Sequence, residues 1–357
     1  MNKEQLINWF LENETELAMK MQETFHGYGN GALDNPYHLE GSIWKHTKMV
    51  MDKAEGYFPD DEDILISALL HDIGKVKTVK DNPDNQRRSF SNHEAISVFM
   101  AGSILKKLGL SQNRRIRILK IIGLHGRLYQ YIGDPENILK VSKMFENEID
   151  TFDDVKKFYL CDHEGRITDS SVKESIKGAA QWFSEVQMYI AMQKYDENKV
   201  KKDKFIRVLV GLPRAGKSTY LENRCWTPED APVIISRDNI LLSRGTGETY
   251  SEIWKRLSDE DQKNIDKELQ SKFNSAVKDG RNIVIDMTNM SAKSRRKWVN
   301  PCKQKGYRIE CIVFSTDIDT CNSRNNDDKN IPYDVLESMA KRFVVPLYDE
   351  FDEVHWI

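Results

Sequence analysis

The sequence lacks the features that mark a secreted or membrane-spanning protein. Its 357 residues include five cysteines and no CxxC pair, which argues against a disulfide framework and against a structural zinc site. No apolar run approaches the roughly 18 consecutive residues that a membrane span requires. The first residues lead directly into a helical pattern, without the apolar segment of a signal peptide. We therefore expect a soluble, cytoplasmic protein without membrane contacts.

An excess of positive charge is also absent. The chain has 53 basic and 56 acidic side chains, so its formal net charge is −3. This balance excludes a basic, histone-like coat but leaves local phosphate-binding patches open, because net charge says nothing about distribution. Hydrophobic residues make up 39% and aromatic residues 10% of the chain, which is enough for packed cores. At about 100–200 residues per domain, the length predicts two or three domains.

Histidine content and helical spacing mark a first domain. All but one of the eight histidines lie between positions 26 and 163. This region shows apolar spacings of three and four, and no convincing alternation of the kind that half-buried strands require. Residues 91–94 are expected to form a capping box at the start of one helix. The expected helices span 2–20, 43–56, 62–73, 92–108, 113–125, 136–146, 152–164 and about 171–197.

A charged run at 198–204 has no apolar periodicity and is the expected linker. Beyond it, short β-rich runs alternate with helical stretches, one of them at about 259–279, which predicts a parallel sheet covered on both faces. The sequence therefore predicts an all-α domain over 1–197, followed by an α/β domain over 205–357. The expected strands span 205–210, 232–236, 282–287 and 308–314.

Several histidines and aspartates of the first domain share a helix face with apolar residues. His46, for example, follows Ile43 by three residues and precedes Val50 by four. A single inward histidine is usually a hydrogen-bonded core residue, but burying many unpaired polar groups is costly unless they share a partner. A divalent metal ion is the economical partner, because it neutralises carboxylates and accepts imidazole lone pairs. The inward residues are His46, His93, His125 and Asp162, and the pair His71-Asp72 ends the apolar segment 64–70.

These residues resemble those of the HD-domain phosphohydrolases over about 35–170. The string Ala-Leu-Leu-His-Asp-Ile-Gly-Lys contains the His71-Asp72 pair, and the other inward residues match the family's pattern around it. One or two divalent transition metals (Mn, Co, Ni, Fe or Zn) suit such imidazole and carboxylate donors. The resemblance implies one ion held by His46, His71, Asp72 and Asp162, and a second position completed by His93 and His125, with Asp72 bridging.

The same resemblance implies hydrolysis of a phosphomonoester or a cyclic phosphodiester. A bound metal lowers the pKa of its water towards about 7, and a pair of metals can hold both the phosphoryl oxygen and the attacking hydroxide. Lys75 is expected near the substrate phosphate, whereas Arg166 is expected to be structural. His38 and Glu40 precede the first expected ligand and are left outside the core site.

The segment 211–218 fits the phosphate-binding pattern G-x-x-x-x-G-K-[ST] completely. A strand is expected just before it and a helix just after it, which is the context of a P-loop. In a P-loop the backbone N–H groups bind the phosphates of ATP or another NTP, Lys217 neutralises the β- and γ-oxygens, and Ser218 reaches Mg²⁺. The expected phosphate-binding residues are Gly211, Pro213, Ala215, Gly216, Lys217, Ser218 and Thr219.

Two later strand ends narrow the class of P-loop protein. Asp238 and Asp286 lie at the carboxyl ends of expected strands, where α/β proteins bind their ligands. A carboxylate there can accept a proton from an incoming hydroxyl. The motif S-R-D at 236–238 and the motif D-x-T-N-(x5)-R-R beginning at Asp286 resemble those of the 5′-hydroxyl polynucleotide kinases, over about 205–345.

This second resemblance implies roles and also shows two departures. It implies Asp238 as the general base for the 5′-OH, Asp286 as an acid that orients the nucleotide and its Mg²⁺, and Arg324 as a lid arginine that contacts the triphosphate. The arginine that the phage enzyme carries three residues after its base falls here on Leu241, for which Arg244 could substitute. The family's second lid arginine has no clear counterpart, because the lid segment is shortened.

The chain resembles fusions in which an HD domain precedes such a kinase and which heal the ends of RNA and/or DNA. The HD domain would remove 2′,3′-cyclic, 2′- or 3′-phosphate ends, the kinase would phosphorylate 5′-OH ends with ATP, and a polynucleotide ligase would act downstream. Two alternatives stay open: an HD nucleotidase fused to a small-molecule kinase, and a nucleotide-sensing regulator with a degenerate kinase. Basic clusters that could steer nucleic acid lie at 87–88, 114–117, 201–202 and 295–297.

Overall fold

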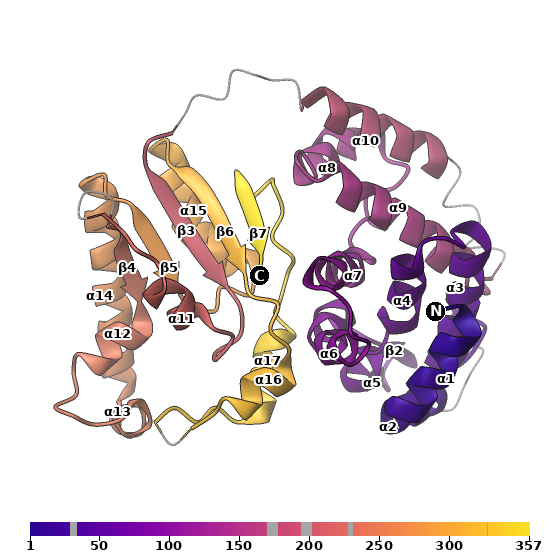
Figure 1. Cartoon of the computed structure of the whole chain (residues 1–357), viewed down its shortest axis with the longest axis horizontal. Helices are drawn as coiled ribbons and strands as arrows, with labels where there is room; N and C mark the ends of the chain where they lie inside the picture. Colours follow the sequence, from indigo (N-terminus) through magenta and orange to yellow (C-terminus); the bar gives the residue numbers. More distant parts are fainter. Residues whose placement is uncertain (29–33, 170–177, 194–201, 228–230, 327) are drawn as a thin grey trace. The chain divides into compact units, whose positions relative to one another are not determined.

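The computed structural model divides into two compact units, Met1–Asp196 and Glu197–Ile357 (Figure 1). It describes residues 1–28, 34–169, 178–193, 202–227, 231–326 and 328–357. The helix expected at 171–197 is described only over Ala179–Gln193, and most of the expected linker at 198–204 lies outside the described residues. The domain boundaries therefore stay a prediction.

The first unit is a helical bundle, as the apolar spacing predicts. Its helix α4 is buried from Asp63 to Leu70 and contacts α3, α7 and α9. A helix that is apolar on all sides belongs in the interior, so the residues that follow α4 also lie inside the bundle. The helices are α1 (Lys3–Asn13), α2 (Thr15–Glu23), α3 (Ile43–Tyr57), α4 (Glu62–Leu70), α5 (Lys75–Thr78), α6 (His93–Lys107), α7 (Gln112–Leu124), α8 (Ile138–Met144), α9 (Ile149–Glu164) and α10 (Ala179–Gln193), with a 3₁₀ turn η1 (Pro135–Asn137) before α8.

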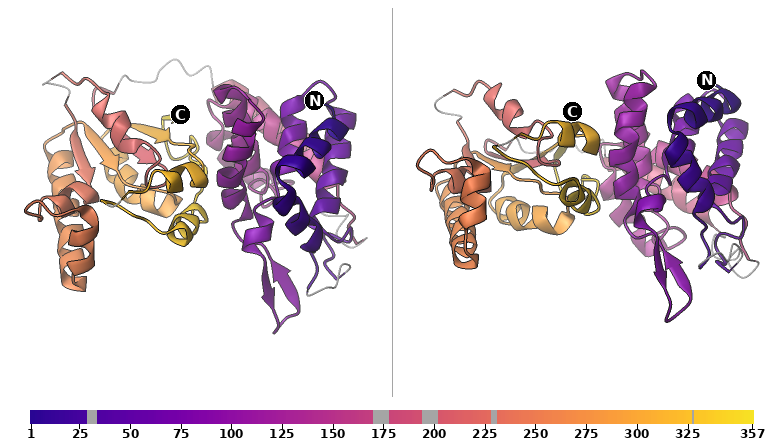
Figure 2. Two further views of the ribbon diagram at one scale, coloured as in Figure 1. Left: turned by 60° about the horizontal axis from the view of Figure 1, so that its bottom comes forward. Right: turned by 90° about the horizontal axis from the view of Figure 1, so that it is seen from below.

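Three local expectations for this unit are wrong. The helix expected at 2–20 is two helices, because Glu14 leaves the helical region at φ −128° and ψ 41°. An antiparallel hairpin of β1 (Lys80–Asn82) and β2 (Arg87–Ser89) projects from the bundle where no strand is predicted (Figure 2). Its side chains are nearly all exposed, so no buried alternation marks it in the sequence. Asn92 precedes α6 in the left-handed region and accepts no capping bond, so the expected capping box does not form.

The second unit contains a five-stranded sheet in which every paired neighbour is parallel. The strands are β3 (Phe205–Val210), β4 (Val233–Ser236), β5 (Ile283–Asp286), β6 (Arg308–Val313) and β7 (Glu353–Trp356), in the order β4-β5-β3-β6-β7. The four predicted strands are confirmed within one residue at each end. The edge strand β7 is not among them, because Glu353 and His355 interrupt the apolar run that marks the other strands.

Parallel pairing aligns the strand ends that carry the predicted site residues. Leu209 of β3 is in register with Asp286 of β5, and Ser236 of β4 is also in register with Asp286. The carboxyl ends of β3, β4 and β5 therefore meet at one edge of the sheet. The P-loop follows β3 at this edge, and Asp238 follows β4 by two residues.

Helices link and cover these strands. The helix predicted at 259–279 is confirmed as α14 (Asp259–Lys278), which begins with a Ser258 capping box and buries Ile265, Leu269 and Phe273. It packs against β4 and β5, while α15 packs against β3 and β6. Among the described residues no helix is long and apolar enough to cross a membrane. The other helices are α11 (Lys217–Glu222), α12 (Arg237–Leu242), α13 (Tyr250–Arg256), α15 (Ala292–Gln304), α16 (Ile318–Ser323) and α17 (Tyr333–Ala340).

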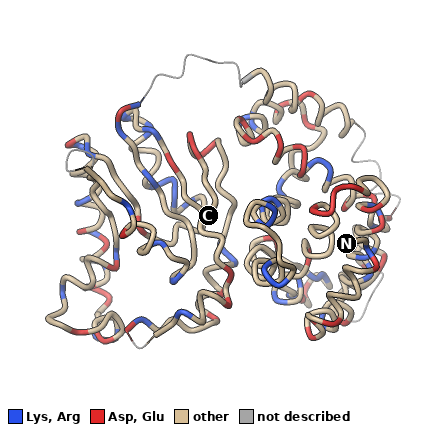
Figure 3. Tube along the Cα trace, viewed as in Figure 1, with Lys and Arg blue, Asp and Glu red and all other residues tan. Residues whose placement is uncertain are grey.

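The basic cluster at 114–117 lies among acidic partners. Nη2 of Arg114 lies 2.6 Å from Oδ1 of Asp63. Nη2 of Arg117 lies 2.7 Å from both Asp61 and Asp154. Basic and acidic residues are interspersed in the same way along the traces of both units (Figure 3). These pairs leave little unbalanced positive charge on α7 to attract nucleic acid.

Arg295, in the basic cluster at 295–297, is a core residue. Its side chain is fully buried, and its guanidinium forms a two-pronged ion pair with Glu350 at 2.6 and 3.0 Å. The same guanidinium donates to the carbonyl oxygen of Val344 at 3.0 Å, which ties α15 to the chain beyond α17. The expectation that Arg295 steers nucleic acid is therefore wrong, whereas Arg296 is exposed.

We predict that Arg295→Met lowers the free energy of unfolding of the second unit by about 3–5 kcal/mol, because Glu350 would keep a buried, unpaired charge. Hydrogen exchange of the β3 and β6 amides, followed by mass spectrometry, measures this change. Arg296→Ala is the matched control and should stay within about 0.5 kcal/mol of the parent chain. Equal exchange in the two variants would contradict the structural role of Arg295.

Candidate metal centre and nucleotide-binding site

The six predicted metal ligands lie together, although they come from five separate helices. His46 lies on α3, His71 and Asp72 follow α4, His93 opens α6, His125 follows α7 and Asp162 lies on α9. Nε2 of His71 is 3.2 Å from Oδ2 of Asp72, and Nε2 of His93 is 3.2 Å from Oδ1 of Asp72. Nε2 of His46 is 3.1 Å from Oδ1 of Asp162. The structure thus places Asp72 at the centre of the cluster.

The ligand atoms of five of these residues fall into two groups that share Asp72, and the sixth residue, Asp162, adjoins the first group through His46. One group comprises His46, His71 and Asp72, and the other comprises Asp72, His93 and His125, with all ligand atoms of a group within 4.8 Å of one another. The two oxygens of Asp72 face different groups, as the oxygens of a bridging carboxylate do. This arrangement suits one or two ions, one on each side of Asp72.

The hydrogen bonds of the imidazoles leave their lone pairs facing the cluster. Nδ1 of His71, His93 and His125 each donates to a backbone carbonyl three residues earlier, at 2.9, 2.9 and 2.7 Å. Each Nε2 therefore keeps a lone pair, and those of His93 and His125 face each other at 3.2 Å. Both oxygens of Asp72 are buried without a well-aligned hydrogen bond. Lone pairs and carboxylate oxygens that face one another need a cation between them, so the donor set fits a divalent metal.

Electrostatics keep the two carboxylates ionised. Burial alone would raise the pKa of Asp72, but His71 and Lys75 outweigh burial and hold this pKa well below its usual value. Burial likewise opposes the ionisation of Asp162, but Arg166, His46 and His71 together outweigh burial and hold the pKa of Asp162 well below its usual value. Nη2 of Arg166 donates to Oδ2 of Asp162 at 2.5 Å, so Arg166 orients a predicted ligand.

Lys75, which the sequence analysis expects near the substrate phosphate, lies beside Asp72, and a histidine that the sequence analysis missed holds it there. Nζ of Lys75 lies 2.7 Å from Oδ2 of Asp72 and 3.1 Å from Nε2 of His26. Nδ1 of His26 donates to the carbonyl oxygen of Gly41 at 3.1 Å, which leaves Nε2 as an acceptor for the ammonium. Burial holds the pKa of His26 well below its usual value, so the ring stays neutral and able to accept. His26 therefore orients Lys75 towards the cluster.

His38 and Glu40, left outside the predicted core site, support His46. Oε1 of Glu40 lies 2.9 Å from Nδ1 of His46 and 2.8 Å from Nδ1 of His38. Its Oε2 accepts from the backbone N–H of Ile167 at 3.0 Å. The rings of His26 and His38 stack with their centroids 4.1 Å apart. A carboxylate at Nδ1 holds the proton there, so Nε2 of His46 is left to face the cluster.

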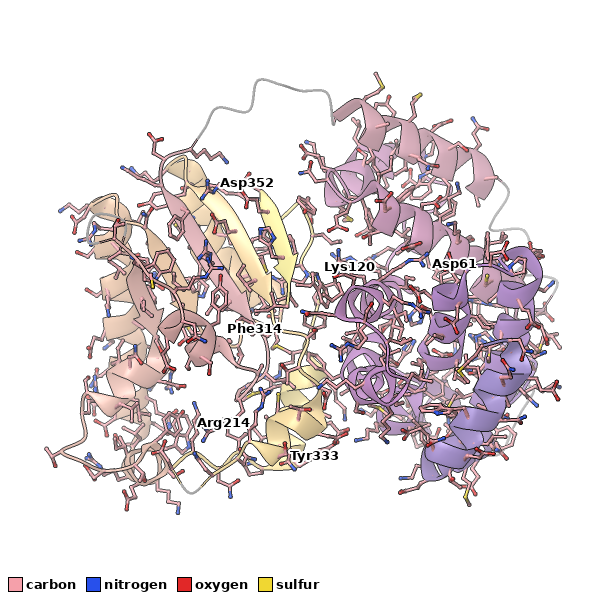
Figure 4. All side chains as sticks on the ribbon, viewed as in Figure 1. Asp61, Lys120, Arg214, Phe314, Tyr333 and Asp352 are labelled. Carbon is pink, nitrogen blue, oxygen red and sulfur yellow. The ribbon has the colours of Figure 1, made fainter. Side chains whose placement is uncertain are left out.

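The P-loop of the second unit closes around its own lysine. Gly216 has a φ of 104°, which glycine adopts without strain. A Cβ on Gly211 would lie 2.8 Å from Cβ of Phe314, so the loop approaches the end of β6 closely (Figure 4). Nζ of Lys217 donates to the carbonyl oxygens of Gly211 and Leu212 at 3.0 and 2.6 Å. Burial lowers the pKa of Lys217 to about 8. Phosphate oxygens could replace these carbonyls as acceptors.

The remaining predicted nucleotide-binding residues surround this loop. Pro213, Ala215, Ser218 and Thr219 lie in the turn after β3 or in the first turn of α11. Nη1 of Arg324, which follows α16, donates to the carbonyl oxygen of Arg214 at 3.0 Å. Asp286 ends β5; burial raises its pKa and the charge of Lys217 opposes that rise. The structure thus brings the loop, Arg324 and Asp286 to one edge of the sheet.

Asp238 lies in the first turn of α12 and pairs with a cation that the sequence analysis missed. The ammonium of Lys329 forms an ion pair with its carboxylate. Leu241 is fully buried, as expected of an apolar replacement for an arginine. Arg244 pairs with Glu268 of α14 at 3.0 Å, and among the described residues no contact joins Arg244 to the P-loop. Lys329, in the shortened lid segment, is thus the cation that reaches the predicted base.

Comparison with known proteins gives the class that this fold and these sites define. Residues 43–169 match the HD domain family, and residues 206–346 match an AAA domain family of P-loop proteins. The chain is therefore an enzyme with an HD domain followed by a P-loop domain that matches this AAA family. The two matched segments contain the metal-ligand cluster and the P-loop respectively.

A curated relative combines two activities of this kind in its name. The bifunctional polynucleotide phosphatase/kinase of Schizosaccharomyces pombe (strain 972 / ATCC 24843) is 25% identical over 151 residues, which are 41% of this chain and 31% of that protein. A solved Pnkp1/Rnl/Hen1 RNA repair complex contains a chain of 23% identity, with 41% of this chain and 46% of that chain covered and a TM-score of 0.33. A chain of a second Pnkp1/Rnl/Hen1 complex is 23% identical, with 38% of this chain and 47% of that chain covered and a TM-score of 0.28. The chain spans less than half the length of each.

We predict that His26→Ala lowers the rate of phosphate ester hydrolysis by the first unit about 10- to 100-fold, because Lys75 loses the acceptor that orients it. The metal content of the purified chain, measured by mass spectrometry of the elements, should stay unchanged, since His26 is not among the six clustered ligands. His163→Ala is the control, because this half-exposed ring stacks on Tyr159 outside the cluster. Loss of metal in His26→Ala, or an equal loss of rate in both variants, would contradict the role of His26.

Proposed function

We propose that the chain is a bifunctional enzyme that heals nucleic-acid ends. The HD domain would remove 2′,3′-cyclic, 2′- or 3′-phosphates, and the kinase domain would phosphorylate 5′-OH ends. One observation carries the proposal: a single chain holds a carboxylate-bridged histidine cluster and, in a separate unit, a P-loop with a carboxylate, Asp238, beside it. The name of the fission-yeast relative, a polynucleotide phosphatase/kinase, supports the substrate class.

In the HD domain, the chain's own residues would hold metal and substrate. His46, His71, Asp72 and Asp162 would hold one ion, and His93 and His125 would complete a second position with Asp72. A bound Mn, Co, Ni, Fe or Zn ion supplies a water of lowered pKa. Lys75, with its ammonium beside Asp72, would neutralise a phosphate oxygen of the substrate. Arg166 would keep Asp162 oriented.

In the kinase domain, Asp238 would accept the proton of the 5′-OH as its oxygen attacks the γ-phosphorus of ATP. The new bond joins the 5′-oxygen to the γ-phosphorus, and the bond from the γ-phosphorus to the bridging oxygen breaks, with its electron pair leaving on ADP. Lys217 and Arg324 would neutralise charge on the transferred group, while Ser218 and Asp286 would position Mg²⁺. ATP, or another NTP, with Mg²⁺ is the expected donor.

The two reactions would act on the two ends that a single strand break leaves. RNA cleaved without a metal carries a 2′,3′-cyclic phosphate on one fragment and a 5′-OH on the other, and a typical ATP-dependent ligase can join neither end. A chain with both sites would convert both ends into ligatable ones, so a polynucleotide ligase is the expected downstream partner. RNA and DNA ends are both candidate substrates.

We predict that Asp72→Ala abolishes phosphate removal and leaves 5′-phosphorylation intact, and that Lys217→Ala does the reverse, each by at least about 100-fold, because each variant loses a central charge of one site. The assay uses an RNA with a 2′,3′-cyclic phosphate and a 5′-OH, labelled ATP, and a series of divalent metals. Asp150→Ala and Lys278→Ala, both at exposed positions, are matched controls.

Four results would change the proposal. Failure of the parent chain to phosphorylate any 5′-OH oligonucleotide would refute it. Phosphorylation of free nucleosides in place of oligonucleotides would favour an HD nucleotidase fused to a small-molecule kinase. Nucleotide binding without transfer would favour a nucleotide-sensing regulator, which the apolar residue at Leu241 also suggests. One variant that silences both activities in a folded chain would contradict independent sites.

A further inference from the structure

Two aromatic side chains of α13 stack on each other, and each has a cation close to its ring. The rings of Tyr250 and Trp254 lie with centroids 6.1 Å apart and planes 7° apart. Nζ of Lys329 lies 4.1 Å from the ring centre of Tyr250, and the guanidinium of Arg237 lies 5.3 Å from that of Trp254. Trp254 is 42% exposed, so this row of side chains is not a closed core.

This cation–aromatic row is adjacent to the candidate base. Lys329 contacts both the Asp238 carboxylate and the Tyr250 ring, so both lie within reach of one ammonium. Arg237 directly precedes Asp238 at the start of α12. The backbone N–H of Tyr250 donates to Oδ1 of Asp328 at 3.1 Å, which ties α13 to the residue before Lys329. The row therefore lies on the side of the site where an attacking hydroxyl would enter.

Lys329 occupies two positions that an acceptor nucleotide needs. The 5′-OH must reach an Asp238 oxygen, which the ammonium now contacts. A base next to that hydroxyl needs an aromatic face, and the same ammonium lies over the ring of Tyr250. Aromatic faces combined with cations are the usual means of binding single strands, and each stacked base contributes about 1–3 kcal/mol.

We infer that Tyr250, backed by Trp254, is the stacking site for the 5′-terminal base of the acceptor strand, and that Lys329 is a placeholder which the strand displaces. The 5′-OH takes the Asp238 oxygen and the base takes the Tyr250 face. Lys329 then pairs with the phosphate on the 3′ side of that nucleotide. The inference rests on the proposed kinase function and adds to it the part of the substrate that is recognised, an unpaired terminal nucleotide.

The base of ATP is the competing occupant of this face. The γ-phosphate of a bound ATP would point towards Asp238, and its base would lie at the other end of the triphosphate. A stacking site adjacent to Asp238 therefore belongs to the acceptor. The two occupants predict different kinetic effects, because loss of the Tyr250 ring would raise the KM for one substrate and leave that for the other unchanged.

Tyr250→Ala should raise the KM for a 5′-OH oligonucleotide roughly 5- to 150-fold, which corresponds to the loss of one stacked base, with the KM for ATP changed less than about 2-fold. Tyr250→Phe keeps the ring and should restore the parent KM. The second part of the test uses an oligonucleotide whose 5′-terminal residue is abasic. The KM of the parent chain for this abasic strand should be as high as the KM of Tyr250→Ala for the intact strand. Tyr250→Ala should have the same KM for both strands. RNA and DNA strands of one sequence are tested, and the effect with either sugar supports the inference.

Trp226→Ala is the matched control in the same unit. Trp226 also stacks on an aromatic ring, that of Phe205, and also has a cation, Arg207, 5.5 Å from its ring centre. Phe205 begins β3, at the opposite end of the strand from the P-loop, about 20 Å away at the usual rise per residue. Its loss should leave both KM values unchanged. The melting temperature of each variant separates loss of fold from loss of binding.

Three outcomes overturn the inference. Tyr250→Ala and Trp226→Ala could have equal KM values for the oligonucleotide, or Tyr250→Ala could raise the KM by the same factor for the intact and the abasic strand. The third outcome is a rise in the KM for ATP alone. These outcomes differ from failure of the proposed function, in which the parent chain itself phosphorylates no 5′-OH strand.

Discussion

The carboxylate of Asp72 sets the arrangement of the first unit. It lies directly after the most apolar helix of the bundle, where an unpaired charge would be expensive, and imidazoles approach each of its oxygens from different helices. Backbone carbonyls hold the far nitrogens of three of these rings, so their lone pairs cannot turn away. The packing of α3, α4, α6, α7 and α9 is consistent with this requirement, because each helix delivers one part of the cluster.

The two candidate sites differ in their donor groups but have one kind of contact in common. The first uses imidazoles and carboxylates that call for a metal ion, whereas the second uses a glycine-rich turn and a lysine. In each, an ammonium group lies against the acid that the chemistry needs: Lys75 beside Asp72, and Lys329 beside Asp238. An ammonium in that position is close enough to the acid to pair with a phosphate that a substrate brings there.

Sequence patterns predicted those parts of the two sites that follow a period or a fixed spacing. His46, His93, His125 and Asp162 were predictable because helical spacing aligned them with apolar neighbours, and the P-loop because its phosphate contacts need glycines at set intervals. The four predicted strands were visible as β-rich runs, whereas the exposed hairpin β1–β2 carried no buried alternation.

The residues that were missed lie outside regular elements or depend on long-range partners. His26 lies in a non-helical segment, so no spacing related it to Lys75, 49 residues later. Lys329 lies in a loop and meets Asp238 across 91 residues. Arg295 lies in a basic run that is typical of an exposed surface. Only its ion pair with Glu350 in the tertiary structure shows that it belongs to the core. Such pairings are properties of the tertiary fold, which one sequence does not display.

The clustered ligands also affect the mechanics of the first unit. Their positions run from His46 to Asp162, so ions held on both sides of Asp72 would together cross-link five helices that are far apart along the chain. By mass action, an ion at a thousand times its dissociation constant adds about 4 kcal/mol to the stability of the state that binds it. A chelator would therefore lower the stability of the helical bundle as well as remove the ion, while the stability of the other unit would stay unchanged.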